Sequence, residues 1–111
     1  MDRDRLDREL RKILALCKQF RSASSQPLNV TAISQHIDTL KQLGISSKRY
    51  ESVIAGLKSL KSIGEEYQTA CAIDDAVGAA RVLEQWQIQC AIVADWVVEL
   101  GMIECAWTKL E

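Results

Sequence analysis

Apolar residues recur at steps of three and four along almost the whole of this sequence. The first run consists of Leu6, Leu10, Ile13, Cys17 and Phe20. The runs that follow are Ile33, Ile37, Leu40 and Leu43; then Tyr50, Val53, Leu57, Leu60, Gly64, Tyr67 and Cys71; and finally Ala79, Leu83, Trp86, Cys90, Val93, Val97 and Leu100. Steps of this size keep side chains on one side of an α-helix, whereas a strand would need a period of two. The sequence therefore predicts helices that each bury one face, and it gives strands little support.

Residues that start and stop helices divide the chain into segments. Ser22–Pro27 is a predicted linker, because proline disfavours helical geometry at the residue before it. We expect Gly44 to end a helix in a left-handed conformation and Ser46 to cap the next one. The acids Asp74 and Asp75 should begin the last helix, where they suit the positive end of the macrodipole. The first two helices are therefore expected at about 2–21 and 31–43, the third from Ser46 with a stripe that reaches Cys71, and the last from Asp74 and Asp75 with a stripe that reaches Leu100.

Two glycines fall on the helical stripes. Gly64 is either a point of close packing or a helix end, and we expect a kink or break there because glycine costs about 1 kcal/mol inside a helix. Gly101 should end or bend the last helix, with Met102–Leu110 as a further short helical piece. Short connections between helices predict an antiparallel arrangement. The expected fold class is all-α, an irregular antiparallel bundle of four or five helices in a single domain, residues 1–111.

No residue pattern typical of catalysis or metal binding is present. The single histidine, His36, falls between two inward positions of its helix, so we expect it to be exposed. The adjacent acids at 65–66 and 74–75 are poor general acid–base pairs, because neighbours on a helix do not face each other. There is also no Glu-x-x-His element, phosphate-binding loop or nucleophile elbow. We therefore expect no catalytic residue, no metal and no cofactor, and a protein that is not an enzyme.

The cysteines bear on the cellular compartment. Cys17, Cys71, Cys90 and Cys105 are far apart in sequence and form no Cys-x-x-Cys pair. Zinc sites need closely spaced ligands, so buried free thiols in a reducing, intracellular compartment are the better interpretation. The first residues lead into an amphipathic helix rather than an apolar run, so we expect no signal peptide. The apolar stretch 88–107 carries Asp and Glu at a density that argues against a membrane span, which favours a soluble protein.

Charge is unevenly distributed along the chain. Residues 1–63 carry 12 Lys and Arg against 6 Asp and Glu, whereas residues 64–111 carry 2 against 9. Either basic and acidic helices pack side by side, or the acidic half meets a basic partner or a second copy in antiparallel association. Acids are interleaved with the bases of the first helix and no aromatic residues accompany them, which disfavours nucleic acid binding.

The last helix carries a second apolar stripe outside its inner one. Its residues are Ile88, Ile92 and Trp96, spaced four apart, and then Ile103 and Trp107. A surface helix needs one apolar stripe, so this helix is either surrounded within the bundle or presents a face to a partner. Tryptophan is also enriched at binding hot spots.

That second stripe favours an adaptor or assembly function. We expect a protein–protein interaction module that uses Ile88, Ile92, Trp96 and Trp107 to bind another protein or a second copy of itself. The alternative is a small immunity-type inhibitor whose acidic half, residues 64–111, occupies the basic cleft of an enzyme. Strongly salt-sensitive binding would favour the second function.

Residues 28–63 resemble a known family of helical domains. The matching segments are Leu28–Val30, Ile37–Leu43, Ile45–Ser46 and Leu57–Ile63, with Val82–Trp86 and Leu6–Leu14 in the places of the closing and opening helices. They resemble the integrase-binding domain of lens-epithelium-derived growth factor and the related N-terminal domain of transcription elongation factors. The resemblance implies a nuclear helical scaffold that grips short peptides of disordered partners. The family's acidic, aliphatic and aromatic contact residues have no counterparts at 24–27 and 64–66, so no binding residue is transferred.

Overall fold

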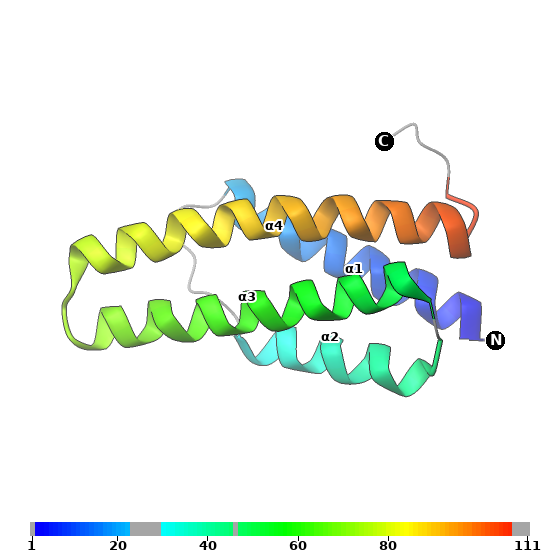
Figure 1. Cartoon of the computed structure of the whole chain (residues 1–111), viewed down its shortest axis with the longest axis horizontal. Helices are drawn as coiled ribbons and strands as arrows, with labels where there is room; N and C mark the ends of the chain where they lie inside the picture. Colours follow the sequence, from blue (N-terminus) through cyan, green and yellow to red (C-terminus); the bar gives the residue numbers. More distant parts are fainter. Residues whose placement is uncertain (1, 23–29, 46, 108–111) are drawn as a thin grey trace.

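A computed structural model of the chain shows a four-helix bundle (Figure 1). The structure describes residues 2–22, 30–45 and 47–107. Its helices are α1 (Asp2–Ser22), α2 (Val30–Leu43), α3 (Lys48–Ala72) and α4 (Ala76–Glu104). The predicted all-α class is thus confirmed, with four helices in the described part of the chain. The predicted linker, apart from Ser22, lies outside the described residues.

Successive helices run in opposite directions and pack in a ring. α1 packs against α2 and α4, and α3 packs against the same two helices, whereas the backbones of the diagonal pairs stay apart in the part of the chain described. This up-and-down order follows from the short connections, which leave each helix no route except back along its neighbour. The basic α1 therefore lies directly beside the acidic α4.

The core is built from the stripes that the sequence spacing predicted. Each helix places four or more apolar residues in the shared interior, and most of them are fully buried. The residues of the predicted stripes that lie in the core are Leu6, Leu10, Ile13, Cys17, Ile33, Ile37, Leu40, Leu43, Tyr50, Val53, Leu57, Leu60, Trp86, Cys90, Val93, Val97 and Leu100. The spacing of three and four residues is thus sufficient to identify the inner face of every helix.

The turns agree with the sequence at two of three points. Gly44 adopts a left-handed conformation with φ of 67°, and Asp75 caps α4 by accepting a hydrogen bond from the Gly78 N–H. The prediction of Ser46 as the cap of α3 was wrong by one position. Ser47 takes that place, because its hydroxyl accepts from the N–H of Tyr50.

Both glycine predictions were wrong about helix breaks. α3 runs through Gly64, and a Cβ there would lie 2.7 Å from Val30 Cγ2 and 3.1 Å from the Trp86 ring. The close approach of α2 and α4 thus explains this glycine. α4 also continues through Gly101 to Glu104, and residues 105–107 form no further helix.

The α3–α4 hairpin is longer than the two helices that pack against it. Its tip, the turn between α3 and α4 with the helix ends beside it, projects beyond the ends of α1 and α2 (Figure 1). The tip is exposed because α1 and α2 do not reach it. Residues 71–77 are all exposed, and no residue of α4 before Trp86 is buried. The bundle is therefore complete at one end and reduced to two helices at the other.

Polar contacts at the edge of the core link α1, α2 and α3. The carboxylate of Glu9, a nearly buried residue of α1, contacts Nδ1 of His36 on α2. The expectation of an exposed histidine was thus wrong, because the ring folds back over this carboxylate and is itself largely covered. The hydroxyl of Tyr50 donates to the carbonyl of Leu40, one of the last four carbonyls of α2, which lack an intrahelical partner.

The Tyr50→Phe substitution tests how much this hydroxyl stabilises the end of α2. Because it leaves a buried carbonyl without its donor, we expect a loss of about 1–2 kcal/mol in the free energy of unfolding. Urea denaturation followed by circular dichroism measures it. Tyr67→Phe, at a less buried site of α3, is the control and should change stability by less than about 0.5 kcal/mol. Equal losses in the two variants would contradict this assignment.

The pH dependence gives a second test of the same residue. Burial, followed by the charge of Glu9, raises the pKa of Tyr50 to about 12 from its ordinary value of 10.0. A raised folded-state pKa means that the contribution is complete below pH 10 and is lost as the pH rises towards 12. The unfolding free energy of the wild type should therefore fall more steeply over this window than that of Tyr50→Phe. Parallel curves would show that Tyr50 does not titrate in this way.

Candidate interaction surface

The structure separates the four residues singled out for interaction into two pairs. Ile88 and Ile92 lie on the outer face of α4, with 59% and 37% of their surface exposed. Trp96 and Trp107 are partly buried and pack against the core. The two isoleucines are neighbours one helical turn apart, whereas Trp107 lies beyond the end of α4. The exposed centre of the candidate surface is therefore aliphatic.

Trp96 is turned towards α3. A Cβ at Gly56 would lie 3.1 Å from its ring, so the absence of a side chain at Gly56 allows the indole to approach the α3 backbone. On the same side of α4, the amide of Gln89 donates to the Gly56 carbonyl at 3.3 Å. Trp96 thus fills the seam between α3 and α4 and leaves one edge beside Ile92.

Trp107 closes the end of α4 onto α1. Ala106 takes a left-handed conformation with φ of 56°, and the N–H of Trp107 then donates to the Gly101 carbonyl at 3.1 Å. Its indole N–H donates to Asp7, which lowers the pKa of that carboxyl, and the Arg11 guanidinium lies 4.7 Å from the ring centroid. The contacts of Trp107 explain why the chain turns back here instead of forming another helix.

The outer face of α4 carries both apolar and polar residues along its length. Two further large apolar side chains lie near its ends, Val77 with 71% and Ile103 with 66% exposed. Between them and the isoleucines stand the exposed residues Arg81, Glu84, Gln85, Asp95 and Glu99. We refer to this stripe, residues 77, 81, 85, 88, 92, 95, 99 and 103, as the outer stripe. The sequence reading missed Val77 and Arg81, although their distances of 11 and 7 residues from Ile88 place them on the same side of a helix.

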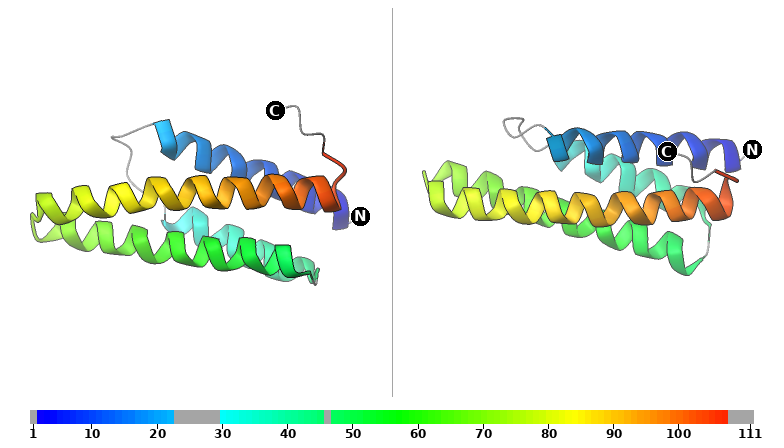
Figure 2. Two further views of the ribbon diagram at one scale, coloured as in Figure 1. Left: turned by 45° about the horizontal axis from the view of Figure 1, so that its top comes forward. Right: turned by 90° about the horizontal axis from the view of Figure 1, so that it is seen from above.

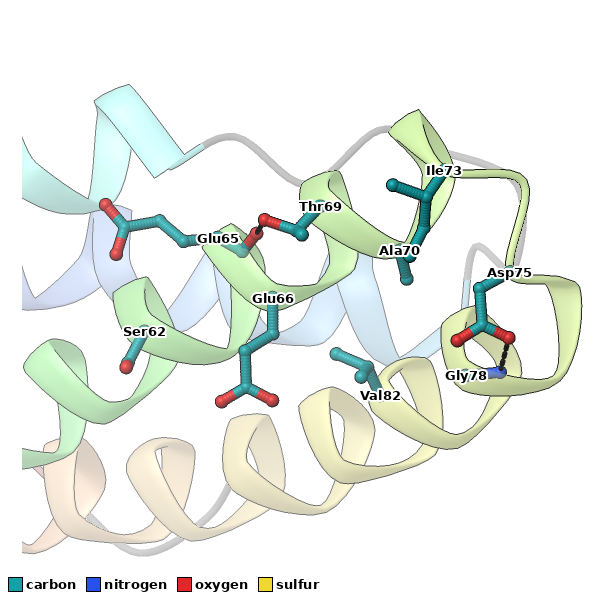
Figure 3. Close-up of a pocket in the computed structure, with 9 residues that line it drawn as sticks. All are labelled: Ser62, Glu65, Glu66, Thr69, Ala70, Ile73, Asp75, Gly78 and Val82. Atoms are coloured by element: carbon teal, nitrogen blue, oxygen red, sulfur yellow. Dashed lines mark hydrogen bonds between the residues drawn. The ribbon is translucent and has the colours of Figure 1, made fainter.

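An open groove of about 440 Å³ lies between α3 and α4 near the hairpin tip (Figure 3). Ala70, Ile73 and Val82 are its apolar lining residues. Glu65 and Glu66 also line it, and their side chains point away from each other. The Asp75 carboxylate, also in the lining, caps α4. Carboxylates arranged in this way do not form an acid–base pair, since their oxygens do not converge on one point.

The buried thiols of Cys17 and Cys90 lie within hydrogen-bond reach of each other, but the metal-binding residue types do not converge in the described part of the chain. Within the described residues, no group of three or more His, Cys, Asp or Glu is placed to hold a metal ion. None of the four cysteines forms a disulfide: Cys17 and Cys90 are buried, as expected, but Cys71 is exposed and Cys105 is half-buried. Cys71 is exposed because it lies on the hairpin tip beyond the cover of α1 and α2.

α4 is the one helix of the described residues that could cross a membrane by length and composition alone. About 39% of its most apolar window is buried in the fold, and a core helix of a water-soluble protein meets the same criteria. The acids Asp95 and Glu99 on the outer stripe would face lipid in such a span, at a considerable energetic penalty.

Comparison with protein-family models, curated proteins and solved structures finds no match for the chain. The resemblance to the integrase-binding domain family stays a prediction. The functional argument therefore depends on the surface itself.

Alanine substitutions should separate the packed residue from the exposed one. Trp96→Ala removes a half-buried indole from the seam over Gly56, and we expect a loss of about 2 kcal/mol in unfolding free energy. Ile88→Ala removes a side chain that faces solvent in the single chain and should change it by less than about 0.5 kcal/mol. Chemical denaturation at micromolar concentration measures both. A larger loss for Ile88→Ala would place Ile88 in the core and remove it from the candidate surface.

Proposed function

We propose that this chain is a non-enzymatic protein–protein interaction or assembly module that binds through the outer face of α4. The observation that carries the proposal is the exposure of Ile88 and Ile92 at the middle of a helix whose opposite face fills the core. Isolated exposed apolar residues are common, but a pair on adjacent turns with further apolar residues along one stripe is typical of a binding face.

The energetics of burial favour this surface. Covering an isoleucine side chain stabilises a complex by about 1.5–3 kcal/mol when the side chain passes from full exposure to full burial. Ile88 and Ile92 are only partly exposed, so covering each of them would contribute a fraction of that free energy. Both contributions come from the centre of the stripe. The polar residues on either side of them would form the rim, where contacts set orientation more than affinity.

The two tryptophans have supporting functions in this proposal. Trp96 holds α4 against α3 and offers an edge beside Ile92, and Trp107 fixes the end of α4 to α1. A rigid backbone lowers the conformational entropy lost on binding, so these contacts preorganise the face.

The occupant of this face is either another protein or a second copy of the chain. We place the protein in a reducing, intracellular compartment, where the exposed Cys71 would remain a thiol. A nuclear location follows only if the resemblance to the integrase-binding domain family holds. The proposal involves no cofactor, metal, membrane or nucleic acid.

A small acidic inhibitor is the second candidate. The exposed carboxylates of Glu65 and Glu66 on the hairpin-tip groove support it, because a basic segment of an enzyme would be attracted to them. It accounts for the acidic half of the chain but not for the exposed isoleucines, so the interaction module is the better supported function.

A photo-reactive amino acid at position 88 tests the proposal in cells. We expect irradiation to give a defined covalent product heavier than the 12.4 kDa chain, because position 88 would lie inside the interface. Adding Ile92→Asp should abolish the product, since a carboxylate cannot be buried there without a partner.

The control for that test is Ser59→Asp, an exposed position of α3 away from the outer stripe, which should leave the product unchanged. Circular dichroism checks that both variants remain helical. No product from position 88, or a product insensitive to Ile92→Asp, would contradict the proposed function.

A further inference from the structure

We infer that the occupant of the outer stripe is a second copy of this chain, paired through α4 in antiparallel orientation about a two-fold axis midway between Ile88 and Ile92. The inference rests on the proposed function, because it takes the outer face of α4 as the interface. It adds the identity of the partner, the direction of the two helices and their register.

The outer stripe is self-complementary when it is read in the opposite direction. An axis between residues 88 and 92 brings position i of one copy opposite position 180 − i of the other. Every residue of the outer stripe then meets a residue of suitable chemistry. The pairs are Val77 with Ile103, Arg81 with Glu99, Gln85 with Asp95, and Ile88 with Ile92.

Each pair has a clear physical effect. The two isoleucine positions bury one another at the centre, and Val77 meets Ile103 at both ends of the interface. Arg81 has no ion pair within the described residues of its own chain, and in the dimer it gains a carboxylate from Glu99 of the second copy. Two-fold symmetry forms each contact twice, so four kinds of pair give eight contacts.

Other ways of pairing two copies of the outer stripe place like charges, or a charged and an apolar side chain, opposite each other. In parallel orientation Arg81 would meet Arg81 and Glu99 would meet Glu99, so like charges would repel. An antiparallel shift of seven residues in one direction brings Arg81 against Ile92, and in the other direction Ile88 against Glu99. The register about residue 90 therefore satisfies the stripe, and these two shifts do not.

The bundle leaves room for this pairing. α4 stands at a corner of the ring, between α1 and α3, and no other described helix lies in front of it in the left view of Figure 2. Its 29 residues make a cylinder about 43 Å long, nearly the 46 Å long axis of the molecule. Two such helices can lie side by side over their full length, and the symmetric contact closes at two copies.

Two charge reversals on the outer stripe test the register. In the Arg81→Glu homodimer both ion pairs become acid against acid, and in the Glu99→Arg homodimer both become base against base. We expect each variant alone to dimerise about tenfold more weakly than the wild type. When the two variants are mixed, both pairs are restored with opposite sign, so the mixed dimer should form with close to wild-type affinity.

The matched control replaces an acid that lies away from the outer stripe. Glu51, on α3, is exposed, so Glu51→Arg mixed with Arg81→Glu should form no tighter dimer than Arg81→Glu alone. Because Glu99 also lies 3.4 Å from Arg49 in its own chain, circular dichroism must show that Glu99→Arg stays folded. Sedimentation equilibrium with one variant fluorescently labelled measures the mixed dimer.

Preferential mixed-dimer formation by Arg81→Glu with Glu99→Arg supports the inference. Its absence, with both variants folded, overturns the inference. If position 88 still gives a cross-link to a different protein, the proposed function survives that result; if position 88 gives no product either, both fail.

Discussion

The inner stripe of α4, from Trp86 to Leu100, needs cover over about four turns of helix. No single neighbour supplies it, and α1 and α3 pack against this stripe from two sides. Because α1 and α2 end before the hairpin does, cover stops at Trp86 on α4. The same geometry puts the outer face of α4 at a corner of the ring, where no helix of the same chain covers it.

Specific polar contacts fix the positions of the helices relative to one another, which hydrophobic burial alone determines less strictly. The Tyr50 hydroxyl ties α3 to the end of α2, the Glu9–His36 contact ties α1 to α2, and the indole of Trp107 ties the end of α4 to α1. Each of them satisfies a group that would be costly to leave unpaired at the edge of a core. The contact of Trp107 joins the end of α4 to α1, which would lower the conformational entropy lost when a partner binds the outer face of α4.

The sequence predicted the helices and their inner faces because periodicity and turn residues act locally. It failed where a distant part of the chain decides the outcome. Gly64 was predicted to break its helix, but it is explained by the close approach of Val30 on α2 and Trp86 on α4. His36 was predicted to be exposed, because its partner Glu9 is 27 residues away in the sequence. For the candidate site, Ile88 and Ile92 were identified from spacing alone, whereas the inward turn of Trp96 depends on the missing side chain at Gly56. Partner and location stay predictions, since they depend on molecules outside the chain.

The two faces of α4 have separate functions in our proposal. The inner stripe accounts for stability, and the proposed pairing through the outer stripe would account for its exposed isoleucines, which a fully solvated helix would not need. The most direct test is the mass of the unmodified chain by light scattering after size exclusion, from micromolar to millimolar concentration. The account predicts a mass that rises from 12.4 kDa towards twice that value as concentration increases. A mass of 12.4 kDa at every concentration would contradict pairing through α4.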